Sequence, residues 1–189
     1  MKDSFNGTSK RVFIAIEFSE NTKSYLNQIQ QIVSSNSSSG NFTHKENFHL
    51  TLKFIGEVKI DLLDKIKKCI DNTALNQNCF QLYFDRLGQF PRRNKSIIWI
   101  GLKPNRLIDK LNLTIETSLD KIGIKKEEQS FTPHITLGRQ AALNESFQLI
   151  AEKINILNDP ILVDKITLME STRIDENLKY VPLYSKSLQ

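Results

Sequence analysis

Short runs of alternating apolar residues are interspersed along the chain with stretches that repeat apolar residues every three or four positions. The first pattern predicts strands at 11–18 and 48–55, and the second predicts helices at 20–33 and from about residue 60 to 73. The serine-rich tract at 34–40 is expected to be a flexible surface loop. Interspersed strands and helices of this kind indicate a mixed α+β fold.

The second half of the chain contains segments of the same kinds. Two strands at 80–90 and 96–102 are expected to be joined by a basic loop, and the clearest helix runs from Pro104 to near Gly123. A strand is predicted at 131–139 and a less regular helix near 145–155. The last predicted strands lie at 161–169 and 180–184.

One tetrapeptide pattern, His-x-Thr-x, occurs on a predicted strand in each half. The first copy is residues 49–52 (His-Leu-Thr-Leu) and the second is residues 134–137 (His-Ile-Thr-Leu). Because side chains alternate along a strand, each histidine shares a face with its threonine, and the apolar residues point towards the core. The repeat predicts a duplicated α+β unit whose two copies face each other across a shared cleft.

Paired imidazoles suit acid-base chemistry, because a group that titrates near pH 6.5 can be neutral in one copy and protonated in the other. Attack of water on a phosphodiester needs a base, an acid and donors to the phosphoryl oxygens, which the hydroxyls of Thr51 and Thr136 could supply. Arg139 adds a fixed positive charge if Gly138 introduces a bulge that turns it into the cleft. Phe54 has the same offset from its histidine but no preceding glycine, so we expect it in the core.

A zinc hydrolase is the competing use of paired histidines. The chain has no HExxH or CxxC pattern and no acid beside either motif, and threonine is a poor zinc ligand. A GxSxG elbow, a P-loop and a GxGxxG turn are also absent from the sequence. We therefore expect no metal and no cofactor, and we assign the third histidine, His44, to the surface.

Charge and composition narrow the classes further. The 26 Lys and Arg residues exceed the 21 Asp and Glu residues, which gives a net charge of +5, and no apolar run approaches the roughly 18 residues needed to span a bilayer. The loop with Arg92, Arg93 and Lys95 is a candidate contact for RNA phosphates, and its alternative role is a solvated hairpin.

The remaining signals concern the cellular compartment. Cys69 and Cys79 are too few to staple a domain of this size, and we expect both to be reduced and buried. Glu17 interrupts the only apolar run near the N-terminus that could serve a signal peptide. The chain is therefore expected to form one cytoplasmic domain over residues 1–189.

The two motifs and their flanking residues resemble the two-histidine (2H) phosphoesterases, and among them the RNA 2′,3′-cyclic phosphodiesterases that were long labelled 2′-5′ RNA ligases. This resemblance implies a bilobal fold of two intertwined lobes, with mostly antiparallel sheets, helices on the outside and a central cleft. It also implies metal-independent hydrolysis of an RNA 2′,3′-cyclic phosphate to a 2′-phosphate, and some members join or cleave 2′-5′ linkages. The segments that carry it are 11–16, 47–58, 87–91, 99–101, 131–139 and 180–183.

The resemblance assigns roles by position. His49 matches the acid that protonates the leaving 3′ oxygen, and His134 matches the base that activates water. Thr51 and Thr136 match the phosphate donors, and Arg139 matches a further phosphate contact. The implied partner is RNA that ends in a 2′,3′-cyclic phosphate, with tRNA fragments as one source, and we expect a monomer that does not bind membranes.

Two other functions remain open at this point. One is a noncatalytic RNA- or nucleotide-binding module, and the other is a cyclic phosphodiesterase that acts on a nucleotide-sugar cyclic phosphate. The presence of both histidines favours an enzyme over the binding module, because binding alone does not need a matched acid and base.

Overall fold

Two four-stranded antiparallel sheets form the framework of the computed structural model, which describes residues 9–189. A separate pair of short strands, β4 (Phe80–Leu82) and β8 (Ile161–Val163), is also antiparallel. The mixed α+β prediction is confirmed. The first eight residues of the predicted domain lie outside the described part of the chain.

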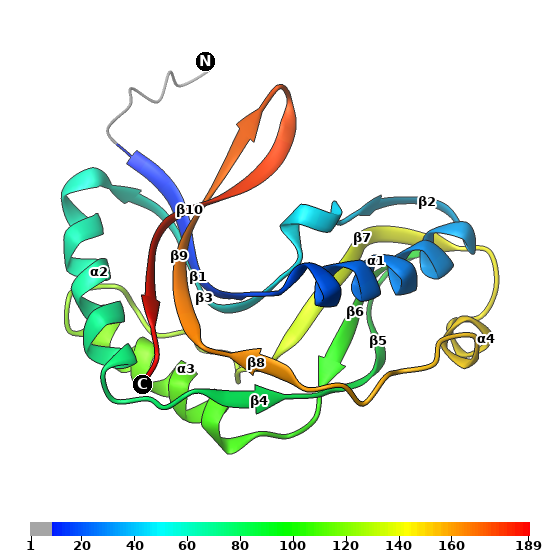
Figure 1. The fold of residues 1–189 in the computed structure, drawn as a ribbon. Coiled ribbons are helices and arrows are strands. Elements are labelled where there is room, and N and C mark those ends of the chain that lie inside the picture. The colour runs from blue at the N-terminus through cyan, green and yellow to red at the C-terminus, as the bar shows by residue number, and fades with distance from the viewer. Residues whose placement is uncertain (1–8) are drawn as a thin grey trace, which may run out of the picture.

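The first sheet combines strands from both ends of the chain. Its order is β10-β9-β1-β3, and helices α2 (Ile60–Ala74) and α3 (Arg106–Asp120) pack against it and against each other. The turn between β9 and β10 projects beyond the rest of the sheet (Figure 1). The strands are β1 (Ser9–Glu17), β3 (His49–Lys59), β9 (Lys165–Ile174) and β10 (Asn177–Ser187).

The second sheet has the order β2-β7-β6-β5, and helix α1 (Glu20–Ser35) packs against β2 and β7. Helix α1 follows β1 of the first sheet directly, so the chain passes from the first sheet to the second early in the sequence. The short helix α4 (Phe147–Glu152) follows β7. The strands are β2 (Ser37–Phe42), β5 (Phe84–Arg92), β6 (Lys95–Leu102) and β7 (His134–Leu143).

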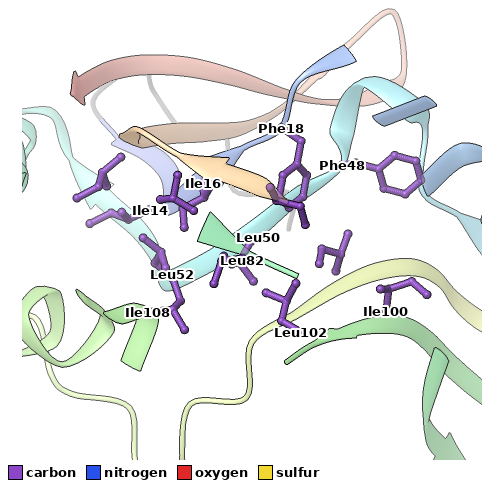
Figure 2. Packing of buried hydrophobic residues seen from close by; sticks show 14 of the residues in the cluster. Ile14, Ile16, Phe18, Phe48, Leu50, Leu52, Leu82, Ile100, Leu102 and Ile108 are labelled. Atoms are coloured by element: carbon purple, nitrogen blue, oxygen red, sulfur yellow. The ribbon is translucent and has the colours of Figure 1, made fainter. Parts of the chain in front are cut away.

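A continuous hydrophobic core joins the two sheets and the helices. Leu50 and Leu52 of β3 lie in it with at most 3% of their surface exposed, beside Ile14 and Ile16 of β1 (Figure 2). Burial of such side chains contributes roughly 1.5 to 3 kcal/mol each. It therefore fixes the register that directs the first histidine and threonine away from the core.

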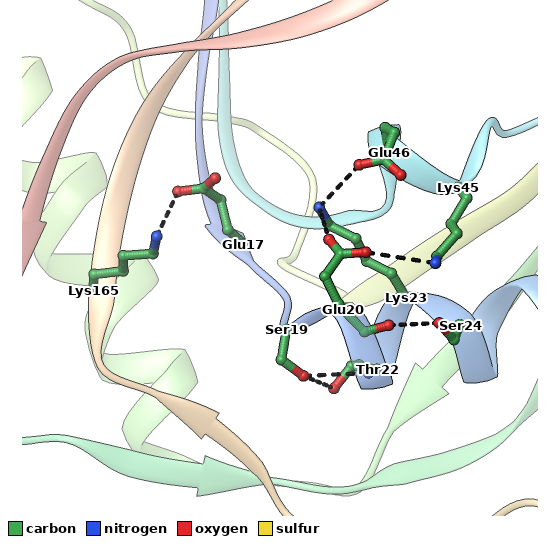
Figure 3. Close-up of polar contacts among 9 residues, drawn as sticks. All are labelled: Glu17, Ser19, Glu20, Thr22, Lys23, Ser24, Lys45, Glu46 and Lys165. Carbon is green, nitrogen blue, oxygen red and sulfur yellow. Dashed lines mark hydrogen bonds and ion pairs between the residues drawn. The ribbon is translucent and has the colours of Figure 1, made fainter.

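A group of ion pairs connects α1 to the segment that leads into the first motif. Lys23 on α1 lies 3.1 Å from Glu20 and 3.6 Å from Glu46 (Figure 3). Glu46 belongs to the 3-10 helix η1 (Lys45–Asn47), which ends two residues before His49. Solvent screens exposed pairs of this kind, so they add little to stability.

The serine-rich tract was wrongly predicted to be a loop. Residues Ser37–Phe42 form β2, the edge strand that pairs with β7. The Ser37 hydroxyl donates to the Val33 carbonyl at 2.8 Å, and the Ser38 hydroxyl donates to the Ala142 carbonyl at 3.1 Å. Phe42 is the one apolar residue of this strand that packs against the core, so the strand has no alternating hydrophobic pattern to detect.

Several smaller predictions can be compared with the structure. The predicted strand at 80–90 is two strands, and β5 continues through Pro91, so the turn of the basic hairpin lies at 93–94. Cys79 is exposed and Cys69 is half-buried, which corrects the expectation that both are buried, and both are free thiols. His44 is exposed, as predicted. Over the described residues, every helix is too short or too polar to cross a membrane.

Candidate active site

Strands of both sheets line a cavity of about 750 Å³, and both His-x-Thr motifs contribute to it. His49 and Thr51 come from β3, and His134 and Thr136 come from β7. The structure thus brings together the four motif side chains in one site, from strands that lie in different sheets.

A bulge in β7 places Arg139 in the same cavity. Thr136 pairs with Trp99 and Gly138 pairs with Ile98, so β7 contains one more residue than β6 over this stretch. The extra residue reverses the alternation of side chains, and Arg139 lines the cavity on the side of the motif. The predicted bulge at Gly138 is confirmed.

A matching bulge occurs in β3. Ala15 pairs with Thr51, but Ile14 pairs with Lys53, so β3 again contains one extra residue just after its threonine. Phe54 therefore turns into the cavity, with 48% of its surface exposed. The expectation that Phe54 belongs to the core is wrong.

A buried ion pair accounts for the second bulge. Lys53 is only 5% exposed, and its Nζ donates to Glu116 Oε2 at 2.9 Å and to the Lys125 carbonyl at 3.0 Å. The backbone N–H of Glu127 donates to the same carboxylate at 3.2 Å. These partners lie on the side away from the cavity, so they favour the bulge without a glycine. They also tie the loop between α3 and β7 to the first motif strand.

The two imidazoles are oriented by equivalent backbone contacts. His49 Nδ1 lies 2.7 Å from the Asn47 carbonyl oxygen, and His134 Nδ1 lies 2.7 Å from the Thr132 carbonyl oxygen. A carbonyl only accepts, so each Nδ1 carries a hydrogen and each Nε2 is left to exchange a proton. His49 Nε2 lies 2.9 Å from Thr51 Oγ1, which donates to it while the imidazole is neutral.

Aromatic rings surround the first histidine. The ring centroids of Phe13 and Tyr180 lie 4.8 and 4.9 Å from that of His49. Burial lowers the pKa of His49 to about 4, and the nearby charges of Arg139 and His134 act in the same direction. His49 is therefore neutral at neutral pH in the ligand-free protein.

Aromatic rings also support the second histidine. The centroids of Phe90 and Trp99 lie 5.5 and 5.9 Å from that of His134. The Trp99 ring takes the space above Gly88, where an added Cβ would lie 2.2 Å from it. Each motif histidine thus lies against the aromatic face of its own sheet.

Comparison with known proteins identifies the family. The model of the 2′-5′ RNA ligase superfamily matches residues 19–175. The chain belongs to this superfamily. The resemblance to the 2H phosphoesterases that the two motifs suggested is confirmed.

The chain is similar in sequence to several proteins named RNA 2′,3′-cyclic phosphodiesterase. That of Methanocaldococcus jannaschii is 33% identical over 130 residues, which are 68% of this chain and 70% of the relative. That of Thermotoga maritima is 27% identical over 175 residues, which are 92% of this chain and 93% of the relative.

Solved structures agree with the fold of this superfamily member. Escherichia coli LigT complexed with 3′-AMP has a TM-score of 0.78 and 25% identity, over 95% of this chain and 98% of that chain. TT0787 of Thermus thermophilus has a TM-score of 0.78 over 94% of this chain and 97% of that chain; at 19% identity it supports the fold alone.

Several residues that line the cavity were not predicted from the sequence. Asn47 Nδ2 donates to the Leu178 carbonyl at 2.9 Å, and Asn47 Oδ1 accepts from the Tyr180 N–H at 3.3 Å, so Asn47 connects the first motif to β10. Asn47 stands two residues before His49, as Thr132 stands two residues before His134. This shared position could have indicated that Asn47 belongs to the site. Arg11 and Arg173 carried no such signal. The hairpin residues Arg92, Arg93 and Lys95 do not line the cavity.

Proposed function

We propose that the protein hydrolyses the 2′,3′-cyclic phosphate at an RNA end to a 2′-phosphate. The observation that carries this proposal is the meeting of two His-Thr pairs and Arg139 in one cavity. A volume of about 750 Å³ is within the range of small-molecule sites and suits a nucleotide. The RNA 2′,3′-cyclic phosphodiesterases among the relatives support the choice of substrate.

In the proposed reaction the phosphate lies between the two histidines. Arg139 and the hydroxyls of Thr51 and Thr136 hold its oxygens and stabilise the charge that develops on them. Nε2 of His134 accepts a proton from water as the water oxygen bonds to phosphorus. His49 gives a proton to the 3′ oxygen as the P–O3′ bond breaks, which leaves a 2′-phosphate and a 3′ hydroxyl.

Because the pKa of His49 is low, this imidazole has to take up a proton from the solvent when the substrate binds. Burial and the charge of Arg139 keep this imidazole neutral in the ligand-free protein. A bound phosphodiester anion offsets the arginine charge and raises the pKa of His49. Since one imidazole must be protonated and the other neutral, we expect a bell-shaped pH dependence of turnover.

The decisive experiment is turnover of an oligoribonucleotide that ends in a 2′,3′-cyclic phosphate, with identification of the product. His49→Ala and His134→Ala should each lower kcat by roughly 10²- to 10⁴-fold. His44→Ala is the matched control, because this exposed histidine lies outside the cavity, and it should keep the wild-type rate. Near-wild-type rates in both motif variants would mean that these histidines are structural.

The same assay separates the alternatives. Binding of the RNA without turnover by the wild-type protein would favour a noncatalytic binding module. Turnover of a nucleotide-sugar cyclic phosphate in preference to the RNA end would favour the third function. A 2′-5′ ligase side activity is tested by offering a 2′,3′-cyclic phosphate end together with a second RNA that has a free 5′ hydroxyl.

A further inference from the structure

Each motif strand carries a bulge directly after its threonine. In β3 the extra residue is Leu52, which has no partner among the described residues of β1. In β7 the extra residue is Leu137, which lies between the paired residues Thr136 and Gly138. Bulges redirect the side chains next to them and are common beside active sites. Their equivalent positions in the two motifs point to a role in orienting the threonine that precedes each bulge.

The two bulges are held by different means. The bulge in β7 lies beside Gly138, whereas the bulge in β3 has no adjacent glycine, and two residues of α3 hold it instead. Asn112 Nδ2 donates to the Leu52 carbonyl at 2.8 Å. Glu116 Oε2 accepts a hydrogen bond from Lys53 Nζ at 2.9 Å. We call Asn112 and Glu116 the α3 clamp.

The α3 clamp is buried on a helix face that is otherwise apolar. Asn112 is 9% exposed and Glu116 is 8% exposed, and because they are four positions apart they lie on one face of the helix. Replacing a buried ion pair by apolar side chains of similar volume is often neutral for stability or stabilising. Stability alone therefore does not account for these polar residues, whereas the geometry of β3 does. The remaining buried residues of α3 are apolar: Ile108, Leu111, Ile115 and Leu119.

The α3 clamp also contacts the segment that leads into the second motif. Glu116 Oε2 accepts from the Glu127 backbone N–H at 3.2 Å. Glu127 belongs to the segment between α3 and β7, and the same segment contains Thr132, whose carbonyl orients His134. One buried carboxylate therefore holds both the strand of the first motif and the approach to the second.

We propose that Asn112 and Glu116 are positioning residues, which hold the bulge in β3 and thereby aim the Thr51 hydroxyl at the phosphate. This inference rests on the proposed function, in which Thr51 donates to a phosphoryl oxygen. In the ligand-free protein the same hydroxyl lies 2.9 Å from His49 Nε2. Without the α3 clamp, β3 can return to regular pairing with β1, and the position of Thr51 is no longer fixed. A displaced donor stabilises the transition state less, because its geometry is not preorganised.

The test measures kcat on an RNA 2′,3′-cyclic phosphate end for variants of α3. Asn112→Leu removes the amide donor, and Glu116→Leu removes the carboxylate acceptor. Each should lower kcat by roughly 10- to 100-fold, the effect of a misplaced group at the reacting centre. Glu116→Gln keeps an acceptor oxygen and should retain most of the activity. Asp120→Asn, an exposed carboxylate on the same helix and outside the cavity, is the control and should keep the wild-type kcat.

A double-variant cycle separates positioning from general damage. Thr51→Val removes the hydroxyl, so in this background Asn112→Leu should lower kcat no further. Glu116→Leu leaves Lys53 buried without its partner and lowers stability, so the cycle is built on Asn112→Leu.

The ¹⁵N NMR shift of His49 Nε2 gives a second readout that needs no turnover. In Asn112→Leu this shift should move towards its value in Thr51→Val, because both variants weaken the hydroxyl contact with the imidazole.

Two results would overturn the inference. One is an equal fall in kcat on Asn112→Leu with and without Thr51→Val. The other is a wild-type kcat and a wild-type His49 Nε2 shift in Asn112→Leu. Absence of turnover by the wild-type protein would instead overturn the proposed function, and the nitrogen shift would still decide whether the α3 clamp positions Thr51.

Discussion

Burial of His49 is expected to make the folded protein less stable in acid. Its pKa falls from 6.5 to about 4 on folding, so between these values the unfolded chain binds a proton that the folded protein does not. The stabilising contribution is therefore complete above pH 6.5 and is lost as the pH falls towards 4. A pKa difference of this size corresponds to roughly 3 kcal/mol.

The measurement is the free energy of unfolding by urea at pH 7 and at pH 4. His49→Gln removes the titrating group. The free energy of unfolding of this variant should therefore fall between pH 7 and pH 4 by roughly 3 kcal/mol less than that of the wild type. His44→Gln is the control, and it should behave as the wild type because His44 is exposed. Equal losses for the wild type and His49→Gln would refute the low pKa.

A bound anion provides a second readout of the same group. Phosphate in the cavity should raise the pKa of His49, because its negative charge offsets that of Arg139. NMR titration of the imidazole with and without a nucleoside 2′-phosphate measures this directly. A pKa that stays at about 4 with the nucleotide bound would rule out His49 as the proton donor.

Three other predictions concern packing, RNA binding and metal. Gly138→Ala places a Cβ 2.7 Å from Phe42 Cδ1, so the free energy of unfolding measured by thermal denaturation should fall by about 1 to 3 kcal/mol. Adding Phe42→Leu to this variant should recover part of the loss, and no recovery would contradict the role of this contact. The triple change of Arg92, Arg93 and Lys95 to Ala should weaken binding of long RNA. The slope of log binding constant against log salt concentration should become shallower by about 0.7 per lost contact. Equal slopes for the wild type and the triple variant would mean that this hairpin is solvated and does not bind RNA. A chelator should leave turnover unchanged, and a loss restored by zinc or magnesium would overturn the mechanism.

Local sequence patterns determined the main elements and the central pair of the site. The helices α1, α2 and α3 and the strands around both motifs follow from periodicity, which depends only on residues close together in the chain. Strand parity then directs each histidine and its threonine to one face, and the repeat of the motif predicts their meeting. Gly138 signalled the bulge that turns Arg139.

Only the tertiary structure decided the rest. The bulge that turns Phe54 into the cavity depends on Glu116, which reaches Lys53 from another helix. Strand β2 depends on backbone hydrogen bonds with β7. Serine residues are compatible with such a strand, but they do not predict one. Arg11 and Arg173 come from strands near opposite ends of the chain and become neighbours of the site through sheet pairing. Contacts between residues far apart in the chain leave no mark on the local pattern, so they became visible only in the folded protein.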